Sequence, residues 1–186
     1  DGPGEHPTQA LLDLYTIRHE LDRIDHLKIA LVGDLKYGRT ARSLALLLRE
    51  TSGAEIVFVA PPSAPMRDDI RRAPDAAGVA YRDEPDLNAA LGDVDVVYQT
   101  RIQKERFESP EAYEAARGTY IIGRDDIARM KPDAILLHPL PRVDEIATDV
   151  DDDPRAAYFR QAHNGVYIRM ALLDMVINPA YRDGAP

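Results

Sequence analysis

Hydrophobic positions along the chain fall into two patterns, short continuous runs and helically spaced sets. Runs rich in Val, Ile and Leu cover residues 28–32, 55–60, 94–100 and 134–137, with a weaker run at 79–82. Helical spacing covers residues 7–25, 41–48, 66–77, 85–91 and 125–130. Continuous apolar runs are typical of strands buried on both faces, and their alternation with helices indicates parallel pairing. The pattern therefore predicts a doubly wound parallel α/β sheet, a Rossmann-like three-layer sandwich with helices on both faces.

The last part of the chain predicts a terminal helical region from residue 154 to 177. It is strongly apolar, and we expect Asn164-Gly165 to interrupt it and Asn178-Pro179 to end it. The run Asp151-Asp152-Asp153 before it is interpreted as a charge cluster at a helix start. A helix with this many apolar residues needs a partner surface, either on this sheet or on another domain.

The predicted topology gathers several polar loops at one edge. Right-handed crossovers place every strand-to-helix connection of a parallel sheet on the same side. We therefore expect residues 33–40, 61–65, 101–106 and 138–142 to converge there. That edge is where open α/β sheets bind ligands.

The HPLP segment, residues 138–141, follows a predicted strand directly. Pro139 and Pro141 lack a backbone N–H, and each biases the preceding residue toward extended conformation. We expect a stiff, extended segment whose carbonyls have few local donors; the alternative is a rigid loop that merely ends a strand. The apolar neighbours of His138 favour a buried, hydrogen-bonded structural histidine over a general base.

Two arginines are candidates for binding carboxylates. Arg39 lies where the loop after residue 32 enters a helix, and the N–H groups of a helix start favour an anion there. Arg101 and Gln103 follow another strand, two positions apart. Arginines on two loops at one edge suggest a dicarboxylate ligand. A surface arginine paired with a neighbouring acid remains the alternative for Arg39 taken alone.

His6 and Gln9 lie three positions apart at the start of the first predicted helix, hence on one face. A neutral imidazole donates to a carbonyl oxygen, and a carboxamide beside it accepts from an amide. The alternative is a His-Pro pair that only begins the helix. The other histidines, His19, His26 and His163, show no ligand spacing, so no metal site is predicted.

Composition excludes several classes of protein. The 186 residues carry a net charge of −9, which argues against nucleic acid as a partner. The absence of cysteine excludes disulfides, thiolate zinc sites and a cysteine nucleophile. No apolar run approaches the roughly 20 residues that span a bilayer, and the chain start lacks a signal-peptide pattern, so a cytoplasmic location is expected. The 19 arginines against 4 lysines, and 22 aspartates against 10 glutamates, fit either salt adaptation or GC-rich coding bias.

In order along the chain, five motifs carry a resemblance to a known family. They are His-Pro-Thr-Gln at 6–9 with Leu-Leu-Asp-Leu at 11–14, Val-Gly-Asp-Leu-Lys-Tyr-Gly-Arg-Thr at 32–40, Thr-Arg-Ile-Gln-Lys-Glu-Arg at 100–106, Leu-His-Pro-Leu-Pro-Arg-Val-Asp-Glu-Ile at 137–146, and Asn-Gly at 164–165 before an apolar helix. Together they span nearly the whole chain. The sequence resembles the carboxyl-terminal half of the aspartate carbamoyltransferase catalytic chain.

The resemblance implies an activity and an aspartate site. In the family, the amine of L-aspartate attacks carbamoyl phosphate, giving N-carbamoyl-L-aspartate and phosphate, an early step of pyrimidine synthesis. By this resemblance Arg39 holds the aspartate α-carboxylate. Arg101, helped by Gln103, holds the β-carboxylate.

The resemblance also assigns the carbamoyl side of the site. His6 donates to the carbamoyl carbonyl oxygen, and Gln9 and the Pro139 carbonyl position the carbamoyl nitrogen. The Leu140 carbonyl, beside Pro141, accepts from the attacking amine. No metal, cofactor or covalent intermediate is required.

Domain organisation and partners follow from the same resemblance. We expect an interdomain helix at 1–26, an aspartate-binding domain at 27–153, and a terminal helix at 154–186 that returns to an amino-terminal carbamoyl phosphate domain. That domain, with its Ser-Thr-Arg-Thr loop, is absent from these residues, so we expect little activity from the chain alone. The family implies a homotrimer, in some cases with regulatory chains. Two alternative functions remain. One is an ornithine carbamoyltransferase, a family that has His-Cys-Leu-Pro where this chain has His-Pro-Leu-Pro at 138–141. The other is a non-catalytic dicarboxylate-binding module.

Overall fold

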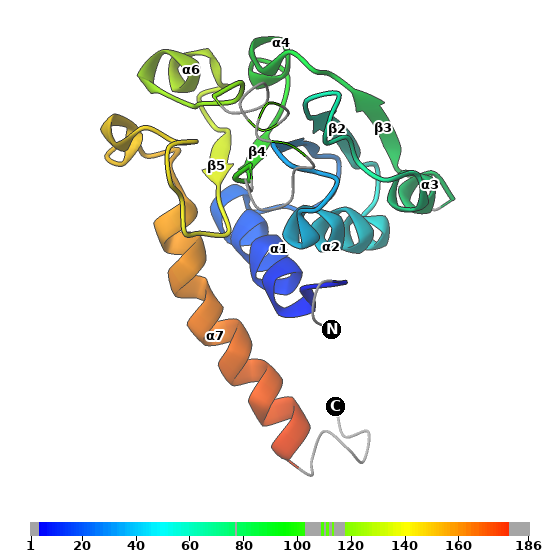
Figure 1. Ribbon diagram of the computed structural model, residues 1–186. Helices are drawn as coiled ribbons and strands as arrows, with labels where there is room; N and C mark the ends of the chain where they lie inside the picture. Colours follow the sequence, from blue (N-terminus) through cyan, green and yellow to red (C-terminus); the bar gives the residue numbers. More distant parts are fainter. Residues whose placement is uncertain are drawn as a thin grey trace.

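The computed structural model describes residues 4–76, 78–102, 109, 111, 113 and 118–178 of the chain. Within these residues, one sheet of parallel strands has the order β3-β2-β1-β4-β5 (Figure 1). The strands are β1 (Lys28–Val32), β2 (Glu55–Val59), β3 (Ala80–Asp83), β4 (Val96–Gln99) and β5 (Ile135–Leu137). The order reverses direction at β1, as in a doubly wound sheet, which confirms the predicted fold class.

Helices cover both faces of the sheet. They are α1 (Pro7–Leu21), α2 (Arg39–Leu47), α3 (Asp68–Ala76), α4 (Leu87–Leu91), α6 (Arg124–Arg129) and α7 (Tyr158–Ile177), with short 3-10 turns η1 (Leu48–Glu50) and η3 (Thr148–Val150). One face packs against α1, α2 and α3, and the other against α4 and α6 (Figure 1). Because successive side chains of a strand point to opposite faces, Phe58 lies in the first core and Val57 in the second.

The loops after β1, β2 and β4 converge at one edge, as predicted. The Gly33 N–H donates to the Val59 carbonyl at 2.9 Å, and the Thr100 hydroxyl donates to the Val32 carbonyl at 2.8 Å. Gly33 has a φ of +112°, and a Cβ there would lie 2.4 Å from the Thr100 carbonyl oxygen. Glycine therefore permits both the turn and the close approach of the β4 loop.

The terminal helix differs from its prediction. The expected interruption at Asn164-Gly165 is wrong, because α7 runs unbroken from Tyr158 to Ile177. Its first half packs on α1, where the Asn164 amide donates to the Thr16 hydroxyl at 3.0 Å and a Cβ on Gly165 would lie 3.3 Å from Leu12 Cδ2. The low helix propensity of this pair is overridden by a contact between two helices.

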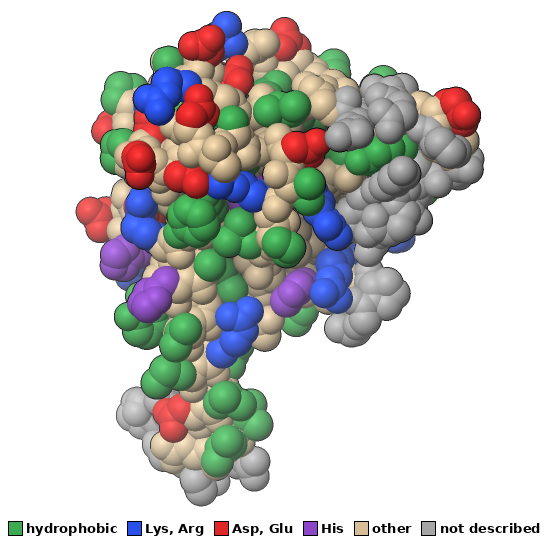
Figure 2. Space-filling model, turned by 60° about the vertical axis from the view of Figure 1, so that its left-hand side comes forward, with side chains coloured by type: hydrophobic (Ala, Val, Ile, Leu, Met, Phe, Trp, Pro, Cys, Tyr) green, Lys and Arg blue, Asp and Glu red, His purple; other side chains and the backbone are tan. Residues whose placement is uncertain are grey.

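The second half of α7 projects from the domain and exposes apolar side chains (Figures 1 and 2). Met170, Leu173, Met175, Val176 and Ile177 are each more than half exposed. The need for a partner surface, expected from the sequence, therefore holds for this half of the helix. None of the described helices has the length and apolar content that a bilayer-spanning segment needs.

Two further expectations are corrected. The first helix ends at Leu21 and not at residue 25, because Asp22 takes a left-handed φ of 55°. The acidic run at 151–153 does not start a helix. Asp151 instead pairs with Arg142 at 2.5 Å, and Asp153 pairs with Arg155 at 2.8 Å, before α7 begins.

Substituting Gly33 tests the close approach of these loops. We expect Gly33→Ala to lower the free energy of unfolding by about 2 kcal/mol or more, since the new methyl adds a backbone clash to the strain of a positive φ. The matched control is Gly78→Ala, because Gly78 also has a positive φ, +75°, but a Cβ added there would have no heavy atom within 4 Å. Urea unfolding monitored by circular dichroism measures both. An equal loss of unfolding free energy at the two positions would contradict the close approach of Gly33 to Thr100.

Candidate functional site

The HPLP segment is held by hydrogen bonds around His138. This side chain is 2% exposed, and its backbone N–H donates to Gln161 Oε1 at 2.8 Å. The Leu140 N–H donates to His138 Nδ1 at 2.8 Å, so the imidazole proton lies on Nε2. Nε2 then donates to Glu145 Oε1 at 2.7 Å. The prediction of a buried, hydrogen-bonded structural histidine is confirmed.

Glu145 extends this network to the chain that follows. Its Oε2 accepts the backbone N–H groups of Val143 and Asp144 at 3.1 and 3.2 Å. Burial opposes ionisation, but the bonds from His138 and the backbone outweigh it and lower the pKa of Glu145 below its ordinary value. An ionised carboxylate thus orients both the imidazole and the loop after the HPLP segment.

The HPLP segment is not extended throughout, contrary to the prediction. Leu140 has a φ of +51°, and the Leu140–Pro141 peptide bond is cis. The physical reason is the bond from the Leu140 N–H to His138, which curls the segment back on its own side chain. Among the described residues, no donor reaches the carbonyl oxygens of Pro139 and Leu140. A strained leucine and two unpaired carbonyls are features found at ligand sites.

A second network centres on Asp13 of α1, which is fully buried. Its Oδ1 accepts from the amides of Gln9, at 2.8 Å, and Gln161, at 2.6 Å. Its Oδ2 accepts from the Tyr98 hydroxyl of β4 at 2.8 Å. Because the Gln161 oxygen accepts from His138, one carboxylate is joined to both Gln9 and the HPLP segment.

Burial dominates the ionisation of Asp13. Desolvation outweighs the hydrogen bonds from Gln161, Tyr98 and Gln9 and raises the pKa of Asp13 to about 7. The same burial, together with the Asp13 carboxylate, raises the pKa of Tyr98 well above its usual range. Tyr98 therefore stays protonated and donates.

His6 precedes α1 and is affected by the charges of Arg39 in α2 and Arg169 in α7. Its backbone N–H donates to the Ser43 hydroxyl of α2 at 2.8 Å. Partial burial lowers the pKa of His6, and the positive charges of Arg39 and Arg169 lower it further. The imidazole is therefore neutral at neutral pH, and an anion is attracted to its surroundings.

The structure places the two predicted arginines after neighbouring strands of the sheet. Arg39 opens α2 after β1, and Arg101 follows β4; the two strands are neighbours, with Val32 paired to Gln99. Both arginines are partly buried. Gln103 lies outside the described residues.

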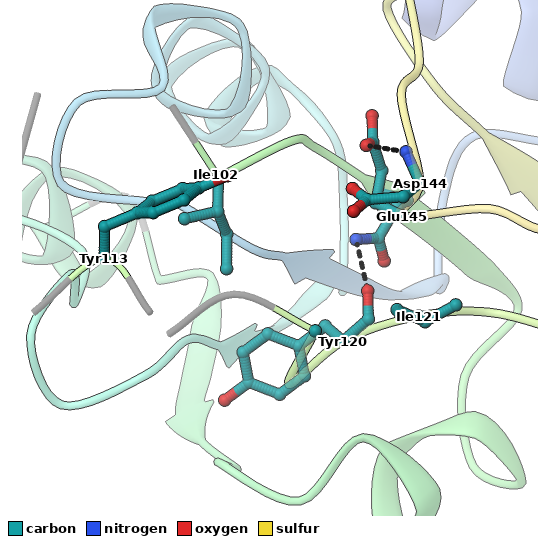
Figure 3. Close-up of a pocket in the computed structure, with 8 residues that line it drawn as sticks. Ile102, Tyr113, Tyr120, Ile121, Asp144 and Glu145 are labelled. Atoms are coloured by element: carbon teal, nitrogen blue, oxygen red, sulfur yellow. Dashed lines mark hydrogen bonds between the residues drawn. The ribbon is translucent and has the colours of Figure 1, made fainter. Parts of the chain in front are cut away.

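A small pocket opens beyond β4, with a cavity of about 20 Å³. Figure 3 shows Ile102 and Tyr113 on one side and Asp144 and Glu145 on the other, with Tyr120 below. Gln99 also lines it; its amide donates to the Tyr120 carbonyl at 3.2 Å, while its buried Oε1 has no partner among the described residues.

Sequence reasoning missed the residues that support the site, namely Asp13, Glu145, Gln161 and Arg169. Asp13 and Gln161 are 148 positions apart, so no local pattern connects them. The one available signal was a polar residue inside an apolar helical run, at Asp13 between Leu12 and Leu14. Within the described residues, no group of three or more His, Cys, Asp or Glu side chains is arranged for a metal ion.

Comparison with known proteins identifies the family. The model of the aspartate/ornithine carbamoyltransferase family, Asp/Orn binding domain, matches residues 25–176. The chain belongs to this family.

Similar carbamoyltransferases cover almost all of this chain. It is 56% identical over 178 residues to the chloroplastic aspartate carbamoyltransferase of Arabidopsis thaliana, covering 95% of this chain and 46% of that protein. It is 51% identical to the aspartate carbamoyltransferase catalytic subunit of Methanothermobacter thermautotrophicus, covering 96% and 56%. The chain thus spans about half the length of the curated relatives it matches.

Solved structures of aspartate transcarbamoylases share the fold. The catalytic subunit from M. jannaschii superposes with a TM-score of 0.89 at 47% identity, covering 96% of this chain and 58% of that one. The Trypanosoma cruzi enzyme in complex with N-(phosphonacetyl)-L-aspartic acid gives a TM-score of 0.86 at 43% identity, covering 93% and 56%.

The raised pKa of Asp13 predicts a pH-dependent stability. The folded pKa is about 7 and the ordinary value is 3.8, so the folded state binds the proton more tightly. The contribution of Asp13 to stability is then greatest below pH 3.8 and falls until the pH passes about 7. Asp13→Asn lacks this titration, so its free energy of unfolding relative to wild type should rise by on the order of 2 kcal/mol between about pH 5 and pH 7.5. Urea unfolding across this range measures it, and a pH-independent difference would contradict the assignment.

Proposed function

We propose that this chain is the aspartate-binding half of an aspartate carbamoyltransferase. The reaction transfers the carbamoyl group of carbamoyl phosphate to the amine of L-aspartate, giving N-carbamoyl-L-aspartate and phosphate in pyrimidine biosynthesis. The observation that carries the proposal is the similarity to the T. cruzi enzyme whose structure contains N-(phosphonacetyl)-L-aspartic acid. That compound joins an aspartate to a phosphonate, the chemical classes of both substrates.

The aspartate side of the site is assigned to two arginines. Arg39 binds the α-carboxylate, and Arg101 with Gln103 binds the β-carboxylate. The adjacency of β1 and β4 supports this, because the loops that carry the arginines leave neighbouring strands at one edge. A guanidinium offers two parallel donors to a carboxylate, which fixes orientation as well as charge.

The carbamoyl side is assigned to α1 and the HPLP segment. His6 donates to the carbonyl oxygen, while Gln9 and the carbonyls of Pro139 and Leu140 accept from N–H groups of the two substrates. The neutral state of His6 supports a hydrogen-bonding role. The Gln9 amide already donates to Asp13, which leaves its oxygen as an acceptor. Pro141 has no N–H that would compete with the substrate for these acceptors.

Catalysis in this proposal rests on orientation and charge. The aspartate nitrogen bonds to the carbamoyl carbon, and the bond from that carbon to the phosphate oxygen then breaks. The attacking amine loses one proton, which leaves on the departing phosphate. Negative charge grows on the carbonyl oxygen in between, where the His6 donor stabilises it. Holding both substrates in reacting geometry removes much of the entropic barrier. No residue of this chain is assigned a covalent role.

Ornithine is the less favoured acceptor. The relatives compared above are aspartate carbamoyltransferases, and arginines suit a carboxylate where an ornithine ammonium would need acidic groups. A non-catalytic module is likewise disfavoured, since the similarity extends to complete catalytic subunits.

The proposed partner is the half of the related carbamoyltransferases that this chain does not cover. We assign 27–153 to aspartate binding, and 1–26 and 154–186 to contact with an amino-terminal carbamoyl phosphate domain. The exposed apolar half of α7 supports that contact. A homotrimer, with or without regulatory chains, completes the proposed assembly.

The composition without cysteine suits the cytoplasm, although the A. thaliana relative is chloroplastic.

A carbamoylation assay tests the function. The 186-residue chain is assayed alone and co-purified with the amino-terminal half of the M. thermautotrophicus catalytic subunit. We expect N-carbamoyl-L-aspartate only in the second case, because carbamoyl phosphate needs groups from both halves. In the combined protein, Arg101→Ala should reduce kcat/KM for aspartate by about 10- to 150-fold. This factor corresponds to the free energy of one hydrogen bond to a charged group.

Arg72→Ala provides the matched control, since Arg72 is an exposed arginine on α3. It should leave kcat/KM unchanged. Strong turnover by the chain alone would contradict the division of the site between two halves. Equal rates in the Arg101→Ala and wild-type proteins would contradict the aspartate site.

A further inference from the structure

Asp13 is a buried acid without a counter-ion. Its side chain is 0% exposed, and its described partners are Gln9, Gln161 and Tyr98, all neutral. Desolvating a carboxylate without a cation costs stability, and an apolar residue at such a position is often more favourable. A fold would be expected to avoid this arrangement unless the carboxylate has another task.

The carboxylate fixes two amide groups that would otherwise be free to flip. The Gln161 amide donates to Asp13 and its oxygen accepts from the His138 N–H, so both ends of the group are determined. The Gln9 amide donates to the same Asp13 oxygen. With its nitrogen directed at Asp13, the Gln9 amide has a fixed orientation, and its oxygen remains available as an acceptor.

The same carboxylate reaches a third element of the site. Tyr98 donates to Asp13 from β4, three positions before Arg101. One group therefore connects α1, β4 and α7, and through α7 the HPLP segment.

We propose that Asp13 is a positioning residue of the carbamoyl-transfer site, which holds Gln9 and the HPLP segment at a fixed separation through the two glutamine amides. The inference rests on the proposed function and goes beyond it, because Asp13 itself contacts no substrate. Displacing reacting groups by about 1 Å costs on the order of 100-fold in rate. Loss of supporting contacts around metal ligands typically costs about 10- to 100-fold.

The first test is kinetic, in the protein combined with the amino-terminal half. Asp13→Ala removes the acceptor, and Gln161→Met keeps the carboxylate but breaks its connection to His138, which covers the case in which Asp13→Ala fails to fold. We expect each to lower kcat by about 10- to 100-fold. Asp13→Asn should recover part of the loss, since one amide oxygen can still accept from both glutamines.

Thr16→Val is the matched control, because it breaks the buried bond to Asn164 one turn further along the same α1–α7 contact. It should lower stability and leave kcat unchanged. A loss in kcat equal to that of Asp13→Ala would show that general loosening of the helix pair is responsible, and would overturn the proposal.

A double-mutant cycle separates positioning from structure. If Asp13 acts partly through Gln9, then Asp13→Ala should reduce kcat by a smaller factor in a Gln9→Ala background than in wild type. The same factor in both backgrounds would overturn the connection to Gln9.

Hydrogen exchange at the His138 backbone amide tests the connection from Asp13 to the HPLP segment, and it requires no activity assay. Exchange should be faster in Asp13→Ala and Gln161→Met than in wild type, and unchanged in Thr16→Val. An unchanged rate in Asp13→Ala would overturn the proposal, whatever reaction the protein catalyses. If the wild-type combined protein forms no N-carbamoyl-L-aspartate, the proposed function is overturned. The exchange rate at His138 then still decides whether Asp13 holds the HPLP segment in place.

Discussion

The buried carboxylate of Asp13 is the constraint on which the site depends. Two amides and one hydroxyl converge on it from α1, α7 and β4, with donor distances of 2.6 to 2.8 Å. Each of these elements carries or adjoins a candidate substrate-binding group. A single acceptor thereby sets the relative placement of parts that are remote in sequence. Its cost is desolvation, which the hydrogen bonds offset only in part.

Rigidity of the HPLP segment has a different origin from the one its prolines suggest. Proline restricts φ, but the turn at Leu140 is held by the His138 side chain, which is itself held by Glu145 and Gln161. The result is a run of backbone whose carbonyls at Pro139 and Leu140 are left without donors among the described residues. Such carbonyls suit a ligand that brings N–H groups, as an amine and a carbamoyl nitrogen do.

Much of the fold could be predicted because its determinants are local. Apolar runs such as residues 28–32 define strands, and the handedness of crossovers determines which loops share an edge. The candidate residues Arg39 and Arg101 followed from that edge, and His138 from its apolar neighbours. The interruption at Asn164-Gly165 failed because helix propensity is weak against packing on α1.

The support of the site could not be predicted in the same way. Whether Asp13 is exposed or buried depends on residues 85 and 148 positions away, and an aspartate in a helix is usually solvated. The curl at Leu140 depends on a side chain to backbone bond that no propensity describes. Family resemblance supplied roles for His6 and Gln9, but the structure supplied the physical reason for their placement.

A crystal structure of the combined protein with N-(phosphonacetyl)-L-aspartate tests the central claim most directly. The account predicts that Gln9 Oε1 and the carbonyls of Pro139 and Leu140 face the ligand, that Arg39 and Arg101 bind its aspartate carboxylates, and that Asp13 keeps its bonds to Gln9 and Gln161. A ligand bound away from the HPLP segment, or an Asp13 carboxylate released from both glutamines in the complex, would contradict it.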